Sequence, residues 1–279
     1  MNVMKGYFIN LDSSTERLKT FDHRLAKLGF LRVCNDPIRW KKGTVEIERL
    51  SAVDGRQMTS VELDSCRQTQ VSFWDWTTHQ LTPGEIGCFL SHRKFWTCML
   101  SDEQSVSFVI EDDIELSKDI LDFLGDLSWL PEDADFVKFN LFPTNSKKLY
   151  PIGHSVSVVK GRKVARTIGR IYGTGCYLIT AKAAKLCLEK SLKMALPVDL
   201  FMFDARFAFA PTTKLYTVLP GLATDDNLTP STIGGKRNKD RLTLLQHVFK
   251  GFYSLARRLR LKQLMRQHAL HWERGDFQA

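Results

Sequence analysis

The chain has 279 residues, of which 43% are hydrophobic and 25% are charged. This is the composition of a globular protein with enough length for one large domain or two small ones. No apolar run approaches the roughly 20 residues that a transmembrane helix needs. Residues 1–11 lack the apolar core and cleavage site of a signal peptide, so we expect a cytoplasmic protein.

The net charge of +9 is concentrated at the end of the chain. From residue 236 onward there are 11 Lys and Arg residues and three acidic ones, a net of +8 that leaves +1 for the first 235 residues. The basic character is therefore a property of the C-terminal segment. The six cysteines include no C-x-x-C pair and no Cys/His group with zinc-site spacing, which argues against a structural zinc or a disulfide framework.

Strand-like and helix-like stretches alternate along the chain, which indicates an α/β fold. A strand over 6–11 precedes a helix over 14–28, and a second strand follows over 44–51. Residues 55–81 are polar and mixed, and they predict no ordered element. Further elements are strands over 107–110, 136–141, 176–179 and 214–219, and a helix over 181–192.

A strong helix start lies at Thr82-Pro83-Gly84-Glu85. Thr82 suits the N-cap, Pro83 the first helical position, and Glu85 the third position of a capping box. The helix is expected to run to about residue 100, with Glu85 and His92 on one face. This inward-facing polar pair predicts an acceptor-binding site, and a buried structural histidine is the alternative.

An apolar run ends in three consecutive carboxylates, Glu111, Asp112 and Asp113. Residues 107–110 predict a short buried strand, so the three acids lie at its carboxyl end. Gathered carboxylates repel one another unless a cation neutralises them, and oxygen ligands suit Mg²⁺ or Mn²⁺. The sequence indicates a metal–diphosphate site at the carboxyl edge of a sheet, with an acidic loop capping the next helix as the alternative.

Two further polar segments follow predicted strands. Asn10-Leu11-Asp12 and Arg17 lie where the first strand meets the first helix, the edge at which open α/β folds bind nucleotides. Asn10 could bind a base or sugar hydroxyl and Arg17 a phosphate, although an Asp12–Arg17 ion pair is the simpler account. Asp54, at the end of the second strand, either accepts hydrogen bonds from a ribose or forms a plain turn.

Three more features complete the candidate site. Gly173 and Gly175 precede a strand, and they either let the backbone approach a ligand closely or form a simple turn. Asp199, expected at a helix N-cap, lies in an apolar stretch, where burial would raise its pKa and suit it to act as a general base. Asp225 begins a polar segment that either closes over a diphosphate and supplies a metal ligand or simply leads to the tail.

The C-terminal segment has the pattern of an amphipathic helix over 241–269. Such a helix suits the surface of an anionic membrane leaflet, and a helix packed on the domain with a solvated basic face is the alternative. No recognised nucleic-acid-binding fold accompanies the charge, so we expect no nucleic-acid partner. The apolar positions are Leu245, Val248, Phe249, Phe252, Leu255, Ala256 and Leu259, and the basic ones are Arg257, Arg258, Arg260, Lys262 and Arg266.

Four ordered motifs resemble the signature of glycosyltransferase family 25, whose members are bacterial lipooligosaccharide sugar transferases with collagen galactosyltransferases as distant relatives. The motifs are Phe8-Ile9-Asn10-Leu11-Asp12 with Arg17, Leu50-Ser51-Ala52-Val53-Asp54-Gly55, Leu81-Thr82-Pro83-Gly84-Glu85-Ile86-Gly87-Cys88 with Ser91-His92, and Val109-Ile110-Glu111-Asp112-Asp113. The resemblance covers roughly residues 5–235. It implies a GT-A-type fold over 1–235, followed by a basic helical extension over 236–279.

The resemblance also implies a UDP-sugar donor, UDP-galactose or UDP-glucose, and inversion at the anomeric carbon. The acceptor would be a lipid-linked oligosaccharide at the inner membrane, where the basic tail would hold the enzyme peripherally. By position, Asp113 and Glu111 resemble the family's motif for Mn²⁺ or Mg²⁺, and Asp199 resembles the catalytic base. The family's usual C-terminal metal-binding histidine is not evident, and Asp225 takes its place. The donor site would comprise Asn10, Leu11, Arg17, Val53, Asp54, Glu111, Asp112, Gly173 and Gly175, and the acceptor site Glu85 and His92.

Two other classes of function are compatible with the sequence. A metal-dependent phosphohydrolase would use the acidic triplet without an acceptor. A non-catalytic membrane or nucleic-acid adaptor would depend on the basic tail and not on Asp113. In a glycosyltransferase, by contrast, sugar transfer requires Asp113, and the tail is needed mainly when the acceptor lies in a membrane.

Overall fold

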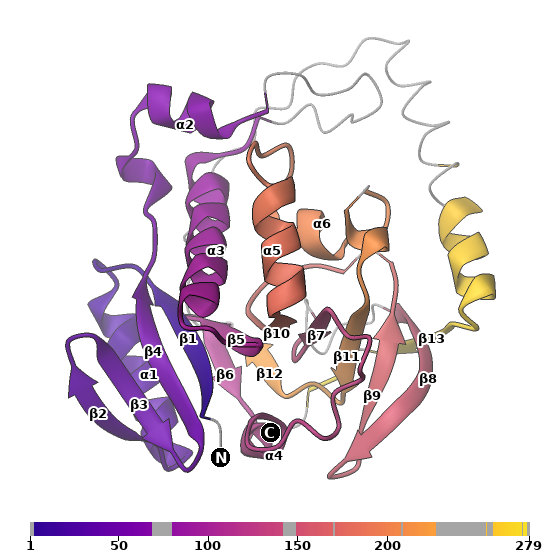
Figure 1. The fold of residues 1–279 in the computed structure, drawn as a ribbon, viewed down its shortest axis with the longest axis horizontal. Helices are drawn as coiled ribbons and strands as arrows, with labels where there is room; N and C mark the ends of the chain where they lie inside the picture. Colours follow the sequence, from indigo (N-terminus) through magenta and orange to yellow (C-terminus); the bar gives the residue numbers. More distant parts are fainter. Residues whose placement is uncertain are drawn as a thin grey trace.

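A computed structural model describes residues 3–68, 80–141, 149–169, 171–207, 209–226, 255, 259–274 and 276–277. Within these residues, eleven strands form one mixed sheet (Figure 1). In spatial order they are β13 (His271–Arg274), β8 (Leu149–Val159), β9 (Arg162–Thr167), β11 (Leu215–Leu219), β7 (Phe136–Lys138), β10 (Cys176–Thr180), β5 (Val106–Glu111), β1 (Met4–Asn10), β4 (Val45–Ser51), β3 (Ile38–Lys42) and β2 (Leu31–Asn35). A separate pair joins β6 (Ile114–Leu116) to β12 (Ala223–Asp225). The predicted α/β class is confirmed, and the GT-A type of fold stays a prediction.

The centre of the sheet is buried on both faces, because successive side chains of a strand point in opposite directions. In β5, Phe108 and Ile110 join one hydrophobic cluster, whereas Val109 between them joins the other. The first cluster contains the buried residues of helices α1 (Thr15–Lys27) and α4 (Ile120–Leu124). The second contains those of α3 (Pro83–Ser101), α5 (Ala181–Lys190) and α6 (Val198–Phe203), so helices cover both faces (Figure 1).

Local signals fix the predicted helix starts. The Thr82 hydroxyl accepts from the Glu85 N–H while the Glu85 carboxylate accepts from the Thr82 N–H, which forms the expected capping box of α3. The Thr180 hydroxyl accepts from the Ala183 N–H and so caps α5. The predicted N-cap role of Asp199 is wrong: Pro197 occupies that position, and Asp199 lies in the first turn of α6. The short helices η1 (Gly55–Gln57), α2 (Ser60–Cys66) and η2 (Ala210–Thr212) were not predicted.

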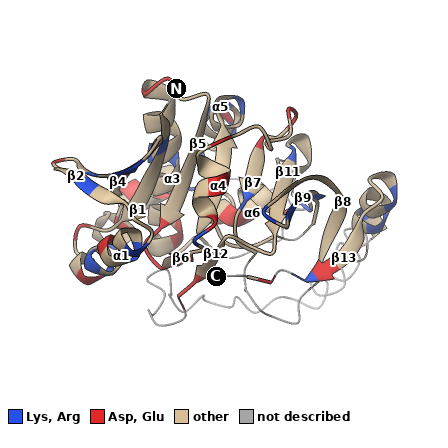
Figure 2. Ribbon diagram, turned by 90° about the horizontal axis from the view of Figure 1, so that it is seen from below, with Lys and Arg blue, Asp and Glu red and all other residues tan. Residues whose placement is uncertain are grey.

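The C-terminal part of the chain contributes to the sheet. The strand β13 pairs with β8, although the sequence predicts only a helix in this region. A helix over 259–267 precedes it and carries basic but no acidic residues (Figure 2). None of the described helices is long and apolar enough to cross a membrane. The predicted apolar positions 245–252, and the polar segment after Asp226, lie outside the described residues.

Parallel pairing aligns three strand ends. The strand β1 runs parallel to β4 on one side and to β5 on the other. Their register places Ile9 opposite Glu111 and Asn10 opposite Ser51. The carboxyl ends of β1, β4 and β5 therefore meet at one edge of the sheet, where open α/β proteins bind their ligands.

Candidate functional site

A pocket that is open to solvent lies at the carboxyl ends of β1, β4 and β5. Most of the residues predicted for the donor site line it. The lining residues are Ile9, Asn10, Leu11, Arg17, Ala52, Val53, Asp54, Gly55, Arg56, Gly84, Cys88, Ser91, His92, Glu111, Asp112 and Asp113. The other predicted site residues, Glu85, Gly173, Gly175, Asp199 and Asp225, are not among the lining residues.

Asp112 is held in place by two neighbours. Asn10 Nδ2 donates a hydrogen bond to it at 2.9 Å, and Arg17 Nη1 forms an ion pair with it at 2.5 Å. The predicted alternative of an Asp12–Arg17 ion pair is wrong, because Asp12 pairs with Arg49 at 2.6 Å. Arg49 also donates to Asn10, so these contacts join the ends of β1, β4 and β5.

Asp113, the next residue, lacks such neighbours. Its carboxylate makes no hydrogen bond or ion pair with any residue in the described part of the chain. Burial and the charges of Glu111, Asp112 and Asp225 together raise the pKa of Asp113 to about 7. An uncompensated carboxylate among other carboxylates is a suitable ligand for a divalent cation, so the residues present fit the predicted metal.

Asp225 reaches this cluster through the small second sheet. In the pairing of β12 with β6, Asp225 lies opposite Ile114, and the N–H of Asp226 donates to the carbonyl of Asp113 at 2.8 Å. An ion pair of 2.9 Å between Arg24 and Asp226 attaches the end of β12 to α1. Burial raises the pKa of Asp225, and the charge of Glu111 raises it further.

A chain of hydrogen bonds orients Glu111. Trp96 Nε1 donates to the Tyr177 hydroxyl at 3.0 Å, and that hydroxyl lies 2.9 Å from His92 Nδ1. His92 Nε2 lies 3.0 Å from Glu111 Oε1, which also accepts from the Thr174 hydroxyl at 2.5 Å. An ionised carboxylate only accepts hydrogen bonds, so we assign the His92 proton to Nε2, which donates to Glu111, and Nδ1 then accepts the hydrogen bond of the Tyr177 hydroxyl.

The charge of Glu111 follows from these contacts. Burial raises its pKa, but the contacts with His92 and with the Thr174 hydroxyl lower it more, so the net pKa lies below the usual value. His92 is buried and lines the pocket, whereas the Glu85 carboxylate caps its own helix. The acceptor-binding roles of both residues stay predictions.

The glycine segment holds Asp199. Gly173 has φ +73°, which favours glycine, and its N–H donates to Asp199 Oδ2 at 3.1 Å. The N–H of Leu200 donates to the other oxygen at 2.8 Å. Gly175 has a packing role: a side chain there would lie 2.4 Å from Ile114, and its carbonyl accepts the Glu111 N–H.

Lys138 is a site residue that the sequence reasoning missed. Its buried ammonium donates to the carbonyls of Tyr172 and Gly173, which fixes the segment that holds Asp199. Burial lowers the pKa of Lys138 to about 8, although the charges of Asp199 and Glu111 favour its cationic form. The available signal was a lysine flanked by apolar residues in the predicted strand 136–141.

Burial raises the pKa of Asp199, and this effect exceeds the opposing hydrogen bonds from the Gly173 and Leu200 N–H groups and the charge of Lys138. The carboxylate is therefore more basic than an exposed aspartate. It is also fixed in direction, because each of its oxygens accepts one backbone N–H. Both properties suit a general base.

The pocket residues that follow β4 are held in place by α3 and η1. The Val53 N–H donates to the Ser91 hydroxyl at 2.8 Å. Asp54 caps η1 and pairs with Arg56 through Nε and Nη2, both at 2.8 Å. The Arg56 contact lowers the pKa of Asp54, so the carboxylate is ionised and oriented.

Comparison with known proteins agrees with the motifs. The model of Glycosyltransferase family 25 (LPS biosynthesis protein) matches residues 3–202, and the chain belongs to this family. Similar proteins include a "Glycosyltransferase 25 family member" of Aedes aegypti, 30% identical over 71% of this chain and 30% of that protein. Another is "Lipooligosaccharide biosynthesis protein lic2B" of Haemophilus influenzae, 29% identical over 53% of this chain and 56% of that protein.

A third relative is the "Probable inactive glycosyltransferase 25 family member 3" of Bos taurus, 31% identical over 56% of this chain and 27% of that protein. The matched regions span between 27% and 56% of the length of these three relatives. The family resemblance predicted from the four motifs is confirmed. One of these relatives is described as inactive, so family membership alone does not identify the catalytic groups of this chain.

Proposed function

We propose that this chain is an inverting, metal-dependent glycosyltransferase that moves a hexose from a UDP-sugar onto a sugar of a lipooligosaccharide core. The proposed donor is UDP-galactose, with UDP-glucose as the alternative. Family membership and the lipooligosaccharide relative support this class of reaction. The observation that carries the proposal is the uncompensated carboxylate of Asp113 in a pocket at the carboxyl edge of parallel strands.

The proposed metal ligands are Asp113, Glu111 and Asp225. The Asp113 carboxylate has no hydrogen-bond or ion-pair partner within the described residues, and only Oε1 of Glu111 accepts hydrogen bonds there. Mn²⁺ or Mg²⁺, when bound, would neutralise the negative charge that develops on the diphosphate leaving group. The three carboxylates would in turn lose the mutual repulsion that raises the pKa of Asp113.

The donor nucleotide would lie along the ends of β1 and β4. Asn10 and Leu11, at the end of β1, and Val53 and Asp54, after the end of β4, all line the pocket. Asp54 is ionised and oriented by Arg56, so it can accept hydrogen bonds from ribose hydroxyls. The pairing of Arg17 with Asp112 would position the acidic turn and place a positive charge near the diphosphate.

Asp199 is the proposed general base. It would accept the proton of the acceptor hydroxyl while the acceptor oxygen bonds to the anomeric carbon, and the bond from that carbon to the diphosphate oxygen breaks on the opposite face. UDP leaves with the electron pair of the broken bond, and the configuration inverts. Lys138 and Gly173 would act as positioning residues, because they hold Asp199 in its direction.

The basic C-terminal segment is the proposed contact with the membrane. In its described part, Arg260, Lys262 and Arg266 are exposed on one helix. Basic side chains near an anionic leaflet each contribute about 1 kcal/mol to binding. We propose that they hold the enzyme peripherally at the inner membrane, where a lipid-linked acceptor is displayed.

The test is transfer from UDP-galactose or UDP-glucose to a truncated lipooligosaccharide core, followed by product mass and UDP release. The wild type should form product only with Mn²⁺ or Mg²⁺, and Asp113→Asn should lose transfer. Asp126→Asn, an exposed aspartate that hydrogen-bonds Ser128, is the matched control and should keep it. UDP-sugar hydrolysis at the same rate without acceptor, or full transfer by Asp113→Asn, would contradict the proposal.

A further inference from the structure

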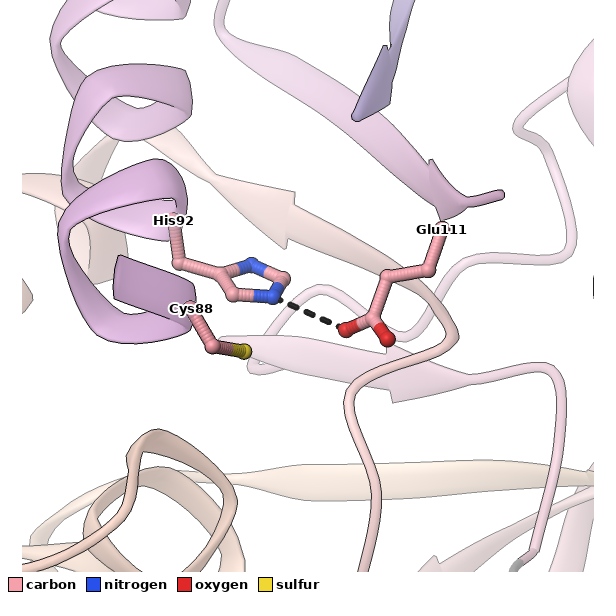
Figure 3. A group of neighbouring side chains, drawn as sticks. All are labelled: Cys88, His92 and Glu111. Carbon is pink, nitrogen blue, oxygen red and sulfur yellow. Dashed lines mark hydrogen bonds and ion pairs between the residues drawn. The ribbon is translucent and has the colours of Figure 1, made fainter. Parts of the chain in front are cut away.

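Three side chains with different ligand atoms meet beside the pocket. Cys88 and His92 lie one helical turn apart on α3, and Glu111 faces them from the end of β5 (Figure 3). One ligand atom of each residue lies within 4.8 Å of the other two. All three line the pocket, so an ion could reach them from solvent.

The spacing of these atoms fits a tetrahedral ion after small side-chain movements. Zinc bonds of about 2.0–2.3 Å place neighbouring ligand atoms roughly 3.3–3.8 Å apart. His92 Nε2 and Glu111 Oε1 are 3.0 Å apart, and the sulfur completes the triangle within 4.8 Å. The ligands come from one helix and one central strand, both of which contribute side chains to the hydrophobic core.

The surrounding hydrogen bonds are those that orient metal ligands. The Tyr177 hydroxyl contacts the nitrogen of His92 that faces away from Glu111, which leaves Nε2 for an ion. The Thr174 hydroxyl donates to Glu111 Oε1 at 2.5 Å. Such outer contacts fix ring orientation and ligand direction in zinc sites.

We propose that Cys88, His92 and Glu111 form a binding site for a thiophilic divalent cation, and that this cation is Zn²⁺. The fourth coordination position of the ion would be open to the pocket. A sulfur and an imidazole favour zinc over the hard ions Mg²⁺ and Mn²⁺. Binding releases the thiol proton of Cys88 to solvent, and the tautomer of His92 changes so that its proton lies on Nδ1 and faces the Tyr177 oxygen. The site shares only Glu111 with the carboxylate cluster around Asp113.

This site also has a consequence for the proposed transferase, and that consequence rests on the proposed function. An ion held by Glu111 and His92 occupies a ligand of the proposed Mn²⁺ site and narrows the pocket. Zinc should therefore inhibit transfer, and the inhibition should weaken when Cys88 is replaced by serine. The binding site itself does not depend on transfer, so it is tested without activity.

Co²⁺ is a direct probe, because a thiolate ligand gives a charge-transfer absorption band and tetrahedral geometry gives intense visible bands. The purified wild type with one equivalent of Co²⁺ should show both, and Zn²⁺ should displace them. Cys88→Ser should lose the thiolate band. Cys98→Ser, which removes another half-buried cysteine of the same helix, should retain it.

Two further variants separate this proposal from the proposed function. Asp113→Asn should keep the thiolate band even though it loses transfer. Thr174→Val removes the hydroxyl that orients Glu111 and should weaken Zn²⁺ binding on the order of 10–100-fold in a chelator competition. The proposal would be overturned if the wild type showed no thiolate band or if the band survived in Cys88→Ser. It would also be overturned if Cys88→Ser and Thr174→Val both bound Zn²⁺ as tightly as the wild type.

Discussion

The charge of Asp113 should cost the folded chain a measurable part of its stability. Its carboxyl group keeps a proton up to about pH 7 in the fold, against a normal pKa of 3.8. Between these two pH values the folded state binds more protons than the unfolded state, so the free energy of unfolding falls as the pH rises from 3.8 to 7. Above pH 7 the carboxylate is ionised in both states, and the free energy of unfolding is lowered by the full amount.

The Asp113→Asn variant removes this cost. A difference of about 3 pKa units corresponds to about 4 kcal/mol, at about 1.36 kcal/mol per unit. Because Asp113 is partly exposed and solvent screens some of the repulsion, we expect a gain of roughly 2–4 kcal/mol at pH 8 without metal. The gain should fall to about 1–2 kcal/mol at pH 5 and vanish below the normal pKa.

Urea denaturation in metal-free buffer at pH 8 and pH 5, followed by tryptophan fluorescence, measures this gain. Asp126→Asn is the matched control: its exposed carboxylate accepts from Ser128, which lowers its pKa, so its replacement should not raise stability at either pH. Mn²⁺ at 100 times its Kd should stabilise the wild type by about 2.7 kcal/mol and Asp113→Asn by much less. An Asp113→Asn variant that gains nothing at pH 8, or gains equally at both pH values, would refute the reasoning.

Three other variants test neighbouring parts of the site. Asp199→Asn should lower kcat on the order of 10²–10⁴-fold while UDP still shifts Tm, and a loss below tenfold would argue against a general base. Lys138→Met removes a positive charge that lowers the pKa of Asp199, so the acidic limb of the pH–kcat/KM profile should move to higher pH; an unmoved limb would contradict this. Replacing Arg260, Lys262 and Arg266 with glutamine should weaken binding to anionic vesicles on the order of 100-fold without changing transfer to a soluble acceptor, and equal vesicle binding would exclude the membrane role.

Those parts of the fold that have a local cause were predictable from the sequence. The strand that ends at Glu111 is an apolar run stopped by charges, and α3 begins with a capping box at Thr82 and Glu85. The outer strands lack such signals. In β2, Leu31 and Val33 are 71% and 54% exposed, so no buried face imposes an alternating pattern.

The residues of the candidate site were largely predictable, but their pairing was not. Arg17 meets Asp112 rather than Asp12 because parallel register brings β5 beside β1, and that register is a tertiary property. Lys138 and Gly173 lie far apart in the sequence, so the ammonium that fixes the segment holding Asp199 becomes visible only in the fold. Buried charges of this kind are retained only with specific partners, which sequence spacing does not reveal.

Thermal unfolding with UDP-galactose, UDP-glucose and UDP-GlcNAc, each with and without Mn²⁺, tests the central claim most directly. The account predicts that one UDP-hexose raises Tm only when Mn²⁺ is present, and that the rise is lost in Asp113→Asn but kept in Asp126→Asn. Equal stabilisation without metal, or no response to any UDP-sugar under either condition, would contradict the proposal that the Asp113 pocket is a metal-dependent nucleotide-sugar site.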